Sequence, residues 1–197
     1  MFVLCCVAFA QSLDSIFPGI QIELMKNTFT SVIIAFGLTL STWAADVTVK
    51  ISEVHLCCQN CVKGVQTAIG KVEGATAAVD KDEGTVSLTG PDKTTVQKAA
   101  DALVAAGYFG KSSDPSIKIS DSTGAKGEKV QSLQVEGVHL CCAKCVTVVN
   151  DSLGSVAGVK ANTAAKGAKS FTVTGDFNDK EVFTALQKEG LTGRVGK

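Results

Sequence analysis

The chain has 197 residues, with 19 basic and 19 acidic side chains, 45% apolar residues and 6% aromatic residues. This length suits one ordinary domain or two small ones. A formal net charge of zero, a pI near 6.7 and the lack of any run of Lys and Arg argue against a nucleic acid partner and against binding to an anionic membrane surface.

The first 45 residues have the features of a precursor segment. From Met25, one Lys is followed by an uncharged apolar stretch that runs to Trp43. Thr42 and Ala44 suit the small-residue rule for cleavage, so the mature chain is expected to start near Ala45. The sequence therefore predicts a secretory signal peptide with Met25 as the true initiator, and an exported protein, either periplasmic or secreted.

An uncleaved membrane anchor is the alternative for this segment, because residues 27–45 are uncharged and about long enough to span a bilayer. The strongly apolar part is shorter than the ~18 residues of a spanning helix, which favours cleavage. A membrane is thus expected as a partner only through an uncleaved segment. Cys5 and Cys6 fall in the removed or untranslated part and receive no role.

The first predicted unit covers residues 46–112. Val47, Val49 and Ile51 alternate with polar residues, which predicts a half-buried strand. A helix is expected to begin at Cys61, because an apolar stripe at helical spacing follows it. The remaining expected elements are strands at 75–79 and 85–88, a helix at 94–106 ended by Gly107, and a strand near 108–111.

The second predicted unit, residues 129–197, repeats the first. A shift of 84 positions superimposes Glu53–Val65 on Gly137–Val149, and the helical stripe continues in register. The other expected elements are strands at 159–163, 170–174 and 191–195, and a helix at 179–189 with Asn178 and Glu181 as a capping pair and Gly190 at its end. The order βαββαβ, found twice, predicts an α+β protein with two tandem ferredoxin-like domains, each an antiparallel sheet with two helices on one face.

Residues 113–128, between the two units, are rich in Ser, Asp, Gly and Lys. This composition predicts a flexible linker.

All Cys and His residues downstream of the precursor segment fall in two His-Leu-Cys-Cys-x-x-Cys motifs. Each motif lies between a predicted strand and a predicted helix, where backbone N–H groups favour thiolates, the ligands that soft metal ions need. Cysteines two residues apart across such a turn can bind one ion, and the pairs with this spacing are Cys58 with Cys61 and Cys142 with Cys145.

Each loop also offers two further candidate ligands. Residues two apart share a face of an extended segment, so His55 lies beside Cys57, and His139 beside Cys141. Cu(I) accepts two thiolates, whereas Zn(II) usually takes four ligands. Because each loop offers these additional groups, both Cu(I) and Zn(II) are candidate ions. The charge of Lys144 is placed to help hold a thiolate pair anionic, although such a side chain is more often simply solvated.

With these motifs, both units resemble heavy-metal-associated domains, the small metal carriers of copper chaperones, P-type ATPases and periplasmic mercury-binding proteins. The resemblance implies that Cys58, Cys61, Cys142 and Cys145 hold the metal. It also places Tyr108 where the family packs an aromatic ring near the metal loop, but the second unit has Leu191 there, so a core position for Tyr108 is favoured over one beside the metal. The loops differ from the family's Gly-Met-x-Cys-x-x-Cys, because Leu replaces its Met, His replaces its Gly and an additional Cys fills its variable position.

The resemblance further implies one thiophilic ion per domain, with Cu(I) or Zn(II) favoured over Cd(II) and Hg(II). The expected function is non-enzymatic: capture, buffering or transfer of the ion. The expected partner is a metal-transporting ATPase or another thiol metalloprotein.

Three alternatives compete with metal binding. A structural disulfide would leave one odd Cys in each motif. A thiol–disulfide oxidoreductase would use the CxxC pairs, but thioredoxin-like proteins need a proline facing that pair, and residues 129–197 contain none. An interaction module with incidental thiols would not explain why the repeats agree best at the thiols.

Overall fold

The computed structural model describes residues 45–196, so the predicted precursor segment up to residue 44, with Cys5 and Cys6, lies outside the described residues. Within this range the protein consists of two successive repeats, each with a four-stranded antiparallel sheet and two helices. The predicted α+β class and the predicted element order are confirmed. No helix within the described range combines the length and the apolar character needed to cross a bilayer.

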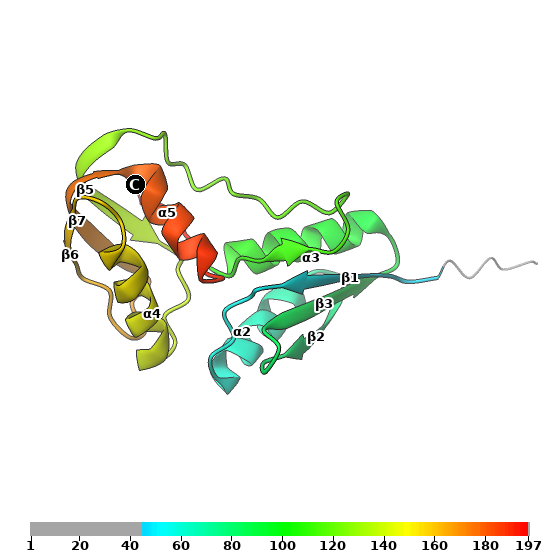
Figure 1. Ribbon diagram of the computed structural model, residues 1–197. Helices are drawn as coiled ribbons and strands as arrows, with labels where there is room; N and C mark the ends of the chain where they lie inside the picture. The colour runs from blue at the N-terminus through cyan, green and yellow to red at the C-terminus, as the bar shows by residue number, and fades with distance from the viewer. Residues whose placement is uncertain (1–44, 197) are drawn as a thin grey trace, which may run out of the picture. The chain divides into compact units, whose positions relative to one another are not determined.

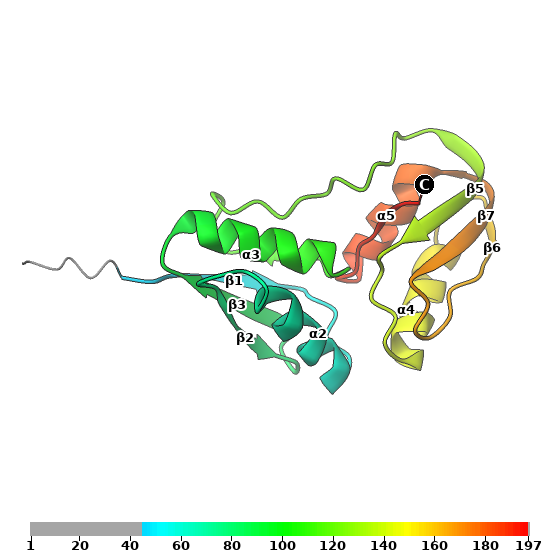
Figure 2. The same cartoon turned by 180° about the vertical axis from the view of Figure 1, so that it is seen from behind.

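The N-terminal repeat has the elements β1 (Val47–Ser52), α2 (Gln59–Ile69), β2 (Thr76–Asp80), β3 (Thr85–Gly90), α3 (Lys93–Ala105) and β4 (Lys111–Ser112). Its sheet order is β2-β3-β1-β4. Figures 1 and 2 show α2 and α3 on the same face of this sheet. The alternation in β1 turns Val49 and Ile51 into the core between sheet and helices, as predicted.

The C-terminal repeat has the elements β5 (Lys129–Glu136), α4 (Ala143–Gly154), β6 (Val159–Asn162), β7 (Ser170–Asn178), α5 (Asp179–Lys188) and β8 (Arg194–Val195). Its sheet order, β6-β7-β5-β8, matches that of the first repeat. Asn178 caps α5 by accepting a hydrogen bond from the backbone N–H of Lys180. Both repeats thus have the order and the sheet topology expected of ferredoxin-like folds.

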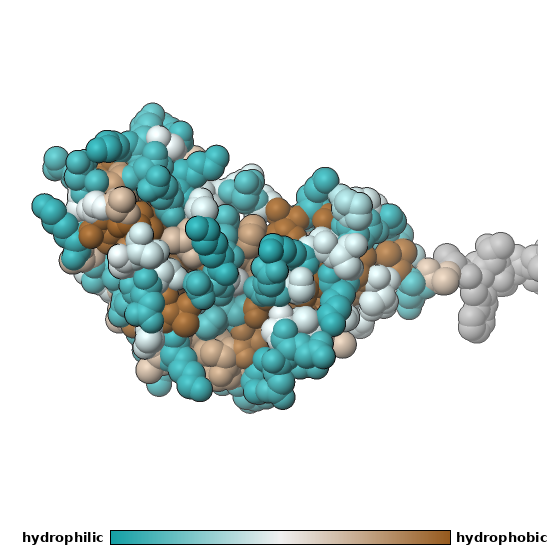
Figure 3. Space-filling model, in the orientation of Figure 1, coloured by the Kyte–Doolittle hydropathy of each residue, from teal (hydrophilic) through white to brown (hydrophobic). Residues whose placement is uncertain are grey.

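The last strand of each repeat is shorter than the pattern predicts. β4 and β8 contain two residues each, and Tyr108 and Leu191, expected in these strands, instead pair with one another in an isolated antiparallel bridge. The backbone at the start of each predicted strand is therefore used for a contact between the repeats. The face in Figure 3 is mostly hydrophilic with small scattered apolar areas, as expected for a chain that buries its apolar residues in its cores.

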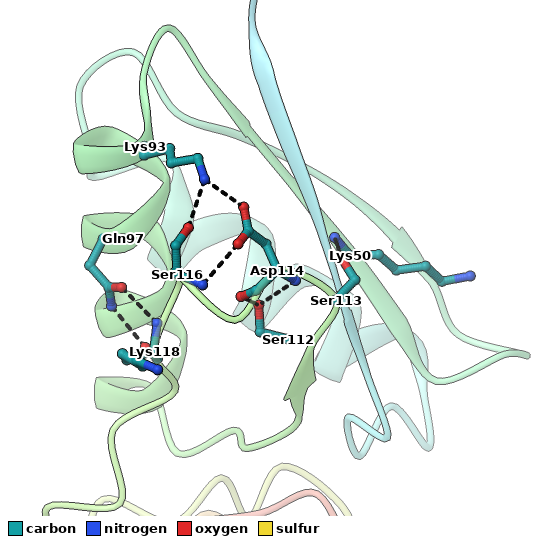
Figure 4. A network of polar contacts seen from close by, with 8 residues as sticks. All are labelled: Lys50, Lys93, Gln97, Ser112, Ser113, Asp114, Ser116 and Lys118. Carbon is teal, nitrogen blue, oxygen red and sulfur yellow. Dashed lines mark hydrogen bonds and ion pairs between the residues drawn. The ribbon is translucent and has the colours of Figure 1, made fainter.

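Residues 113–128, the predicted linker, make specific contacts with α3. Lys93 of α3 donates to Asp114 at 2.9 Å and to Ser116 at 2.8 Å (Figure 4). Gln97 and Lys118 exchange two hydrogen bonds of 2.8 Å, and Ile117 is buried. Lys93 thus bonds to side chains of this segment, and Gln97 supplies partners for a part of its backbone that belongs to neither sheet.

The carboxylate of Asp179 anchors the far end of the segment. It accepts hydrogen bonds from the backbone N–H groups of Lys126, Gly127 and Glu128 at 2.7 to 3.0 Å. Burial by itself would raise the pKa of Asp179, but these N–H groups hold it below its ordinary value.

Asp179→Asn tests this anchor. The amide offers one acceptor oxygen in place of a carboxylate that serves three N–H groups, so we expect a loss of about 1–3 kcal/mol of unfolding free energy at neutral pH. The native pKa is lowered, so the contribution of the carboxylate is present above its unfolded pKa and is lost as the pH falls through the native value. Urea unfolding of both proteins at neutral and acidic pH should therefore show a difference that shrinks in acid. A difference independent of pH would contradict the anchor.

Candidate metal centre

The two motif loops occupy equivalent positions, each between the first strand and the first helix of its repeat. α2 and α4 begin at Gln59 and Ala143, two residues before the predicted start, with Cys58 and Cys142 as N-cap residues of extended backbone. This corrects the expected helix start at the last Cys of each motif. Thiols at the N-cap lie beside the unpaired N–H groups of the first helical turn.

The earlier helix start places the last cysteine of each motif on the buried face of the helix. Cys61 and Cys145 are 0% exposed, whereas Cys57, Cys58, Cys141 and Cys142 are half-buried. Leu56 and Leu140 are buried in the cores, as predicted for the apolar residue that precedes the cysteines. The thiols therefore extend from the protein interior towards solvent.

The two repeats contact one another through the turns that follow α3 and α5. Gly190 accepts hydrogen bonds from the N–H groups of His55, at 3.2 Å, and Phe109, at 3.0 Å. Gly107 accepts one from the N–H of Thr192 at 3.0 Å. Both glycines have positive φ, +90° at Gly107 and +72° at Gly190, and each packs against the backbone just before the motif of the other repeat.

This contact brings the two loops together. The Sγ atom of Cys57 lies 3.4 Å from those of Cys142 and Cys145. The equivalent contacts of Cys141 are 3.4 Å to Cys58 and 3.5 Å to Cys61. The six cysteines of the described range are free thiols and form one group. We call it the six-cysteine cluster, and its members are Cys57, Cys58, Cys61, Cys141, Cys142 and Cys145. The structure thus places side by side the two loops that the sequence presented as separate sites.

The two histidines lie at the edge of the six-cysteine cluster. A ring nitrogen of His55 and the sulfurs of Cys57 and Cys145 lie within 4.8 Å of one another. The Nε2 atoms of His55 and His139 are both buried without a hydrogen-bond partner. Burial lowers the pKa of His55, which favours the neutral imidazole that metal ions bind.

Tyr108 lies beneath the loops. It is fully buried, donates a hydrogen bond of 2.9 Å to the carbonyl oxygen of Cys61 and stacks on the ring of His139 with 4.6 Å between ring centroids. Tyr108 thus connects the first loop to the histidine of the second. Lys144 is exposed and makes no hydrogen bond or ion pair within the described residues.

Close packing of the thiols lowers the pKa of some of them and raises the pKa of others. The N–H of Cys145 lowers the pKa of Cys142 to about 7, as expected at an N-cap. Burial raises the pKa of Cys57 to about 12 and raises that of Cys141. The neighbouring Cys145 thiol lowers the pKa of Cys61, and the same contact raises that of Cys145. The cluster therefore favours a mixture of thiolates and thiols that a cation would convert fully to thiolates.

The sequence predicted the cysteine and histidine candidates but not their arrangement across the two repeats. The contributions of Gly107 and Gly190 to the interface were missed, because the sequence indicated only that they end helices. Positive φ at these positions agrees with that role, since both follow the helix C-cap.

Comparison with known proteins finds similar chains among solved structures. No family model and no curated protein matches the chain. Among solved structures, the N-terminal soluble domains of Bacillus subtilis CopA are similar at 14% identity, covering 78% of this chain and 95% of that one, with a TM-score of 0.28. The first two RRM domains of yeast poly(U) binding protein (Pub1) align at 10% identity over 76% of this chain and 98% of theirs, with a TM-score of 0.24.

Gly190→Ala tests the contact that joins the loops. A Cβ at this position would collide with the carbonyl oxygen of Glu53 and lie 2.5 Å from the N atom of His55. Gly167→Ala is the matched control, because Gly167 has a similar φ of +78° but open space around it. The control should lose about 1–2 kcal/mol for the strained backbone, and Gly190→Ala a further ~1–3 kcal/mol. Equal losses in urea unfolding would contradict the close contact.

Proposed function

We propose that this protein is an exported, non-enzymatic member of the heavy-metal-associated group that captures a thiophilic metal ion in the six-cysteine cluster. It buffers the ion or transfers it to a metal-transporting ATPase or another thiol metalloprotein. The single observation that carries the proposal is the convergence of six free thiols from two loops, with cross-repeat sulfur distances of 3.4 to 3.5 Å.

The type of ligand supports a soft ion. Within the described residues, the groups able to hold a metal consist only of Cys and His. Thiolates and imidazoles select Cu(I), Zn(II) and their heavier relatives, whereas Mg²⁺ and Ca²⁺ need oxygen ligands. Cu(I) and Zn(II) are the favoured ions, and Cd(II) and Hg(II) suit the same ligands.

The exposure of the cluster supports transfer. Cys58 and Cys142 are half-buried and lie at helix N-termini, so a thiolate of a partner protein can approach while a thiolate of the cluster leaves. Cys61 and Cys145 are fixed in the cores and keep their positions during such an exchange. Ligand exchange of this kind needs no catalytic acid or base.

Metal retention by the reduced chain from Ala45 onward is the main test. We expect it to hold Cu(I) or Zn(II) against a moderate chelator. Serine at all of Cys58, Cys61, Cys142 and Cys145 should lower the affinity by about 100-fold or more, because these sulfurs bond the ion directly. Lys160→Ala, at an exposed position of β6, is the control, and its affinity should stay within about twofold. A wild-type chain that releases all metal, or one with disulfide reductase turnover that survives metal removal, would contradict the proposal.

Export is tested separately. Expression of the whole chain in a bacterial host should give a soluble periplasmic product whose first residue, found by N-terminal sequencing, lies near Ala45. Changing both Thr42 and Ala44 to bulky residues should block processing. A product that keeps Met25 and sediments with membranes would instead favour the uncleaved anchor.

A further inference from the structure

The additional cysteine of each motif, Cys57 or Cys141, lies closest to the CxxC pair of the other repeat. Cys141 contacts Cys58 at 3.4 Å and Cys61 at 3.5 Å, and these two are 3.7 Å apart. These three sulfurs, which we call triad A, form a closed triangle with two members from the first repeat and one from the second.

A second triangle of sulfurs has one member from the first repeat and two from the second. Cys57 lies 3.4 Å from both Cys142 and Cys145, and these two are 3.8 Å apart. We call these three sulfurs triad B. The two triads share no residue, and together they use all six cysteines of the described residues.

Within its own loop, each additional cysteine is placed less favourably. Cys57 makes one close sulfur contact there, 3.7 Å to Cys61, and Cys141 makes one, 3.8 Å to Cys145. Each lies within 3.5 Å of both members of the other repeat's pair, and within 3.8 Å of only one member of its own. The sulfurs of Cys141, Cys142 and Cys145 also lie within 4.8 Å of one another, but the nearest third sulfur for each CxxC pair is the one from the other repeat.

The dimensions of the triads suit a metal ion. Sulfurs bound at ~2.3 Å with tetrahedral angles lie roughly 3.8 Å apart, so edges of 3.4 to 3.8 Å need only a small expansion. A fourth donor is close to triad B, because a ring nitrogen of His55 lies within 4.8 Å of the sulfurs of Cys57 and Cys145. The Nε2 atoms of His55 and His139 are buried without a hydrogen-bond partner. A bond to a metal ion would satisfy such a buried nitrogen.

We propose that the protein binds two thiophilic ions in one centre, one in triad A and one in triad B, so that each ion bonds to sulfurs of both repeats. This inference rests on the proposed function and specifies its ligands. Each thiol releases its proton to solvent as its sulfur bonds the metal. Because every ion bonds to both repeats, removal of either ion requires breaking a bond that joins them.

Two triple variants, each with three cysteines left, test whether each ion takes its third sulfur from the other repeat. Cys58→Ser/Cys61→Ser/Cys141→Ser removes triad A and leaves triad B complete. Cys57→Ser/Cys58→Ser/Cys61→Ser leaves the whole second loop, Cys141, Cys142 and Cys145. Zn(II) and Cu(I) are titrated separately into each reduced chain against a chelator, and X-ray absorption counts the sulfur neighbours. Circular dichroism before titration checks that both variants fold.

The wild-type chain is expected to hold two ions with three sulfurs each. The variant that keeps triad B should hold one ion with three sulfurs and an affinity within about threefold of wild type. The variant that keeps the second loop should bind about 10-fold more weakly or worse, since even outer partners of metal ligands are worth 10–100-fold. Equal affinities, or the reverse order, in a wild-type chain that binds two ions would overturn this inference alone. A wild-type chain that retains no metal would overturn the proposed function as well.

Discussion

The backbone contact at Gly107 and Gly190 is the constraint on which the six-cysteine cluster depends. At both positions a positive φ and the lack of a side chain allow one repeat to approach the segment that leads into the other repeat's motif. Hydrogen bonds across this contact then fix the loops relative to one another. A larger residue at either position would separate the loops and remove the 3.4 Å sulfur contacts between them.

The candidate centre is also joined to both cores. Cys61 and Cys145 are at once members of the cluster and fully buried residues of α2 and α4. Tyr108 links the carbonyl of Cys61 to the ring of His139. Since small repeats of this size have limited cores, an ion that binds only the folded arrangement would add to the stability of both.

Much of the fold was predictable because its signals are local. Alternation in β1, the glycines after α3 and α5, and the Asn178 cap depend on residues close in sequence. The start of α2 was placed two residues too late, because Cys58 is not among the residues that favour an N-cap.

The arrangement of the site was harder to predict. The motif identified every cysteine and histidine of the cluster, yet the sequence repeat suggested two separate loops. The two loops come together through contacts between residues far apart in sequence, such as Gly190 with His55 and Tyr108 with His139. Likewise, the composition of residues 113–128 gave no sign of Asp179 as a partner, because that hydrogen bonding depends on the folded chain.

The presence of both loops on one polypeptide has a consequence for how the centre forms. Two separate chains would pair only above a certain protein concentration, and dilution would part them. Here the anchored segment at residues 113–128 keeps the second loop near the first at every dilution, so assembly is a unimolecular event. The metal affinity of such a chain should therefore not depend on the concentration of the protein.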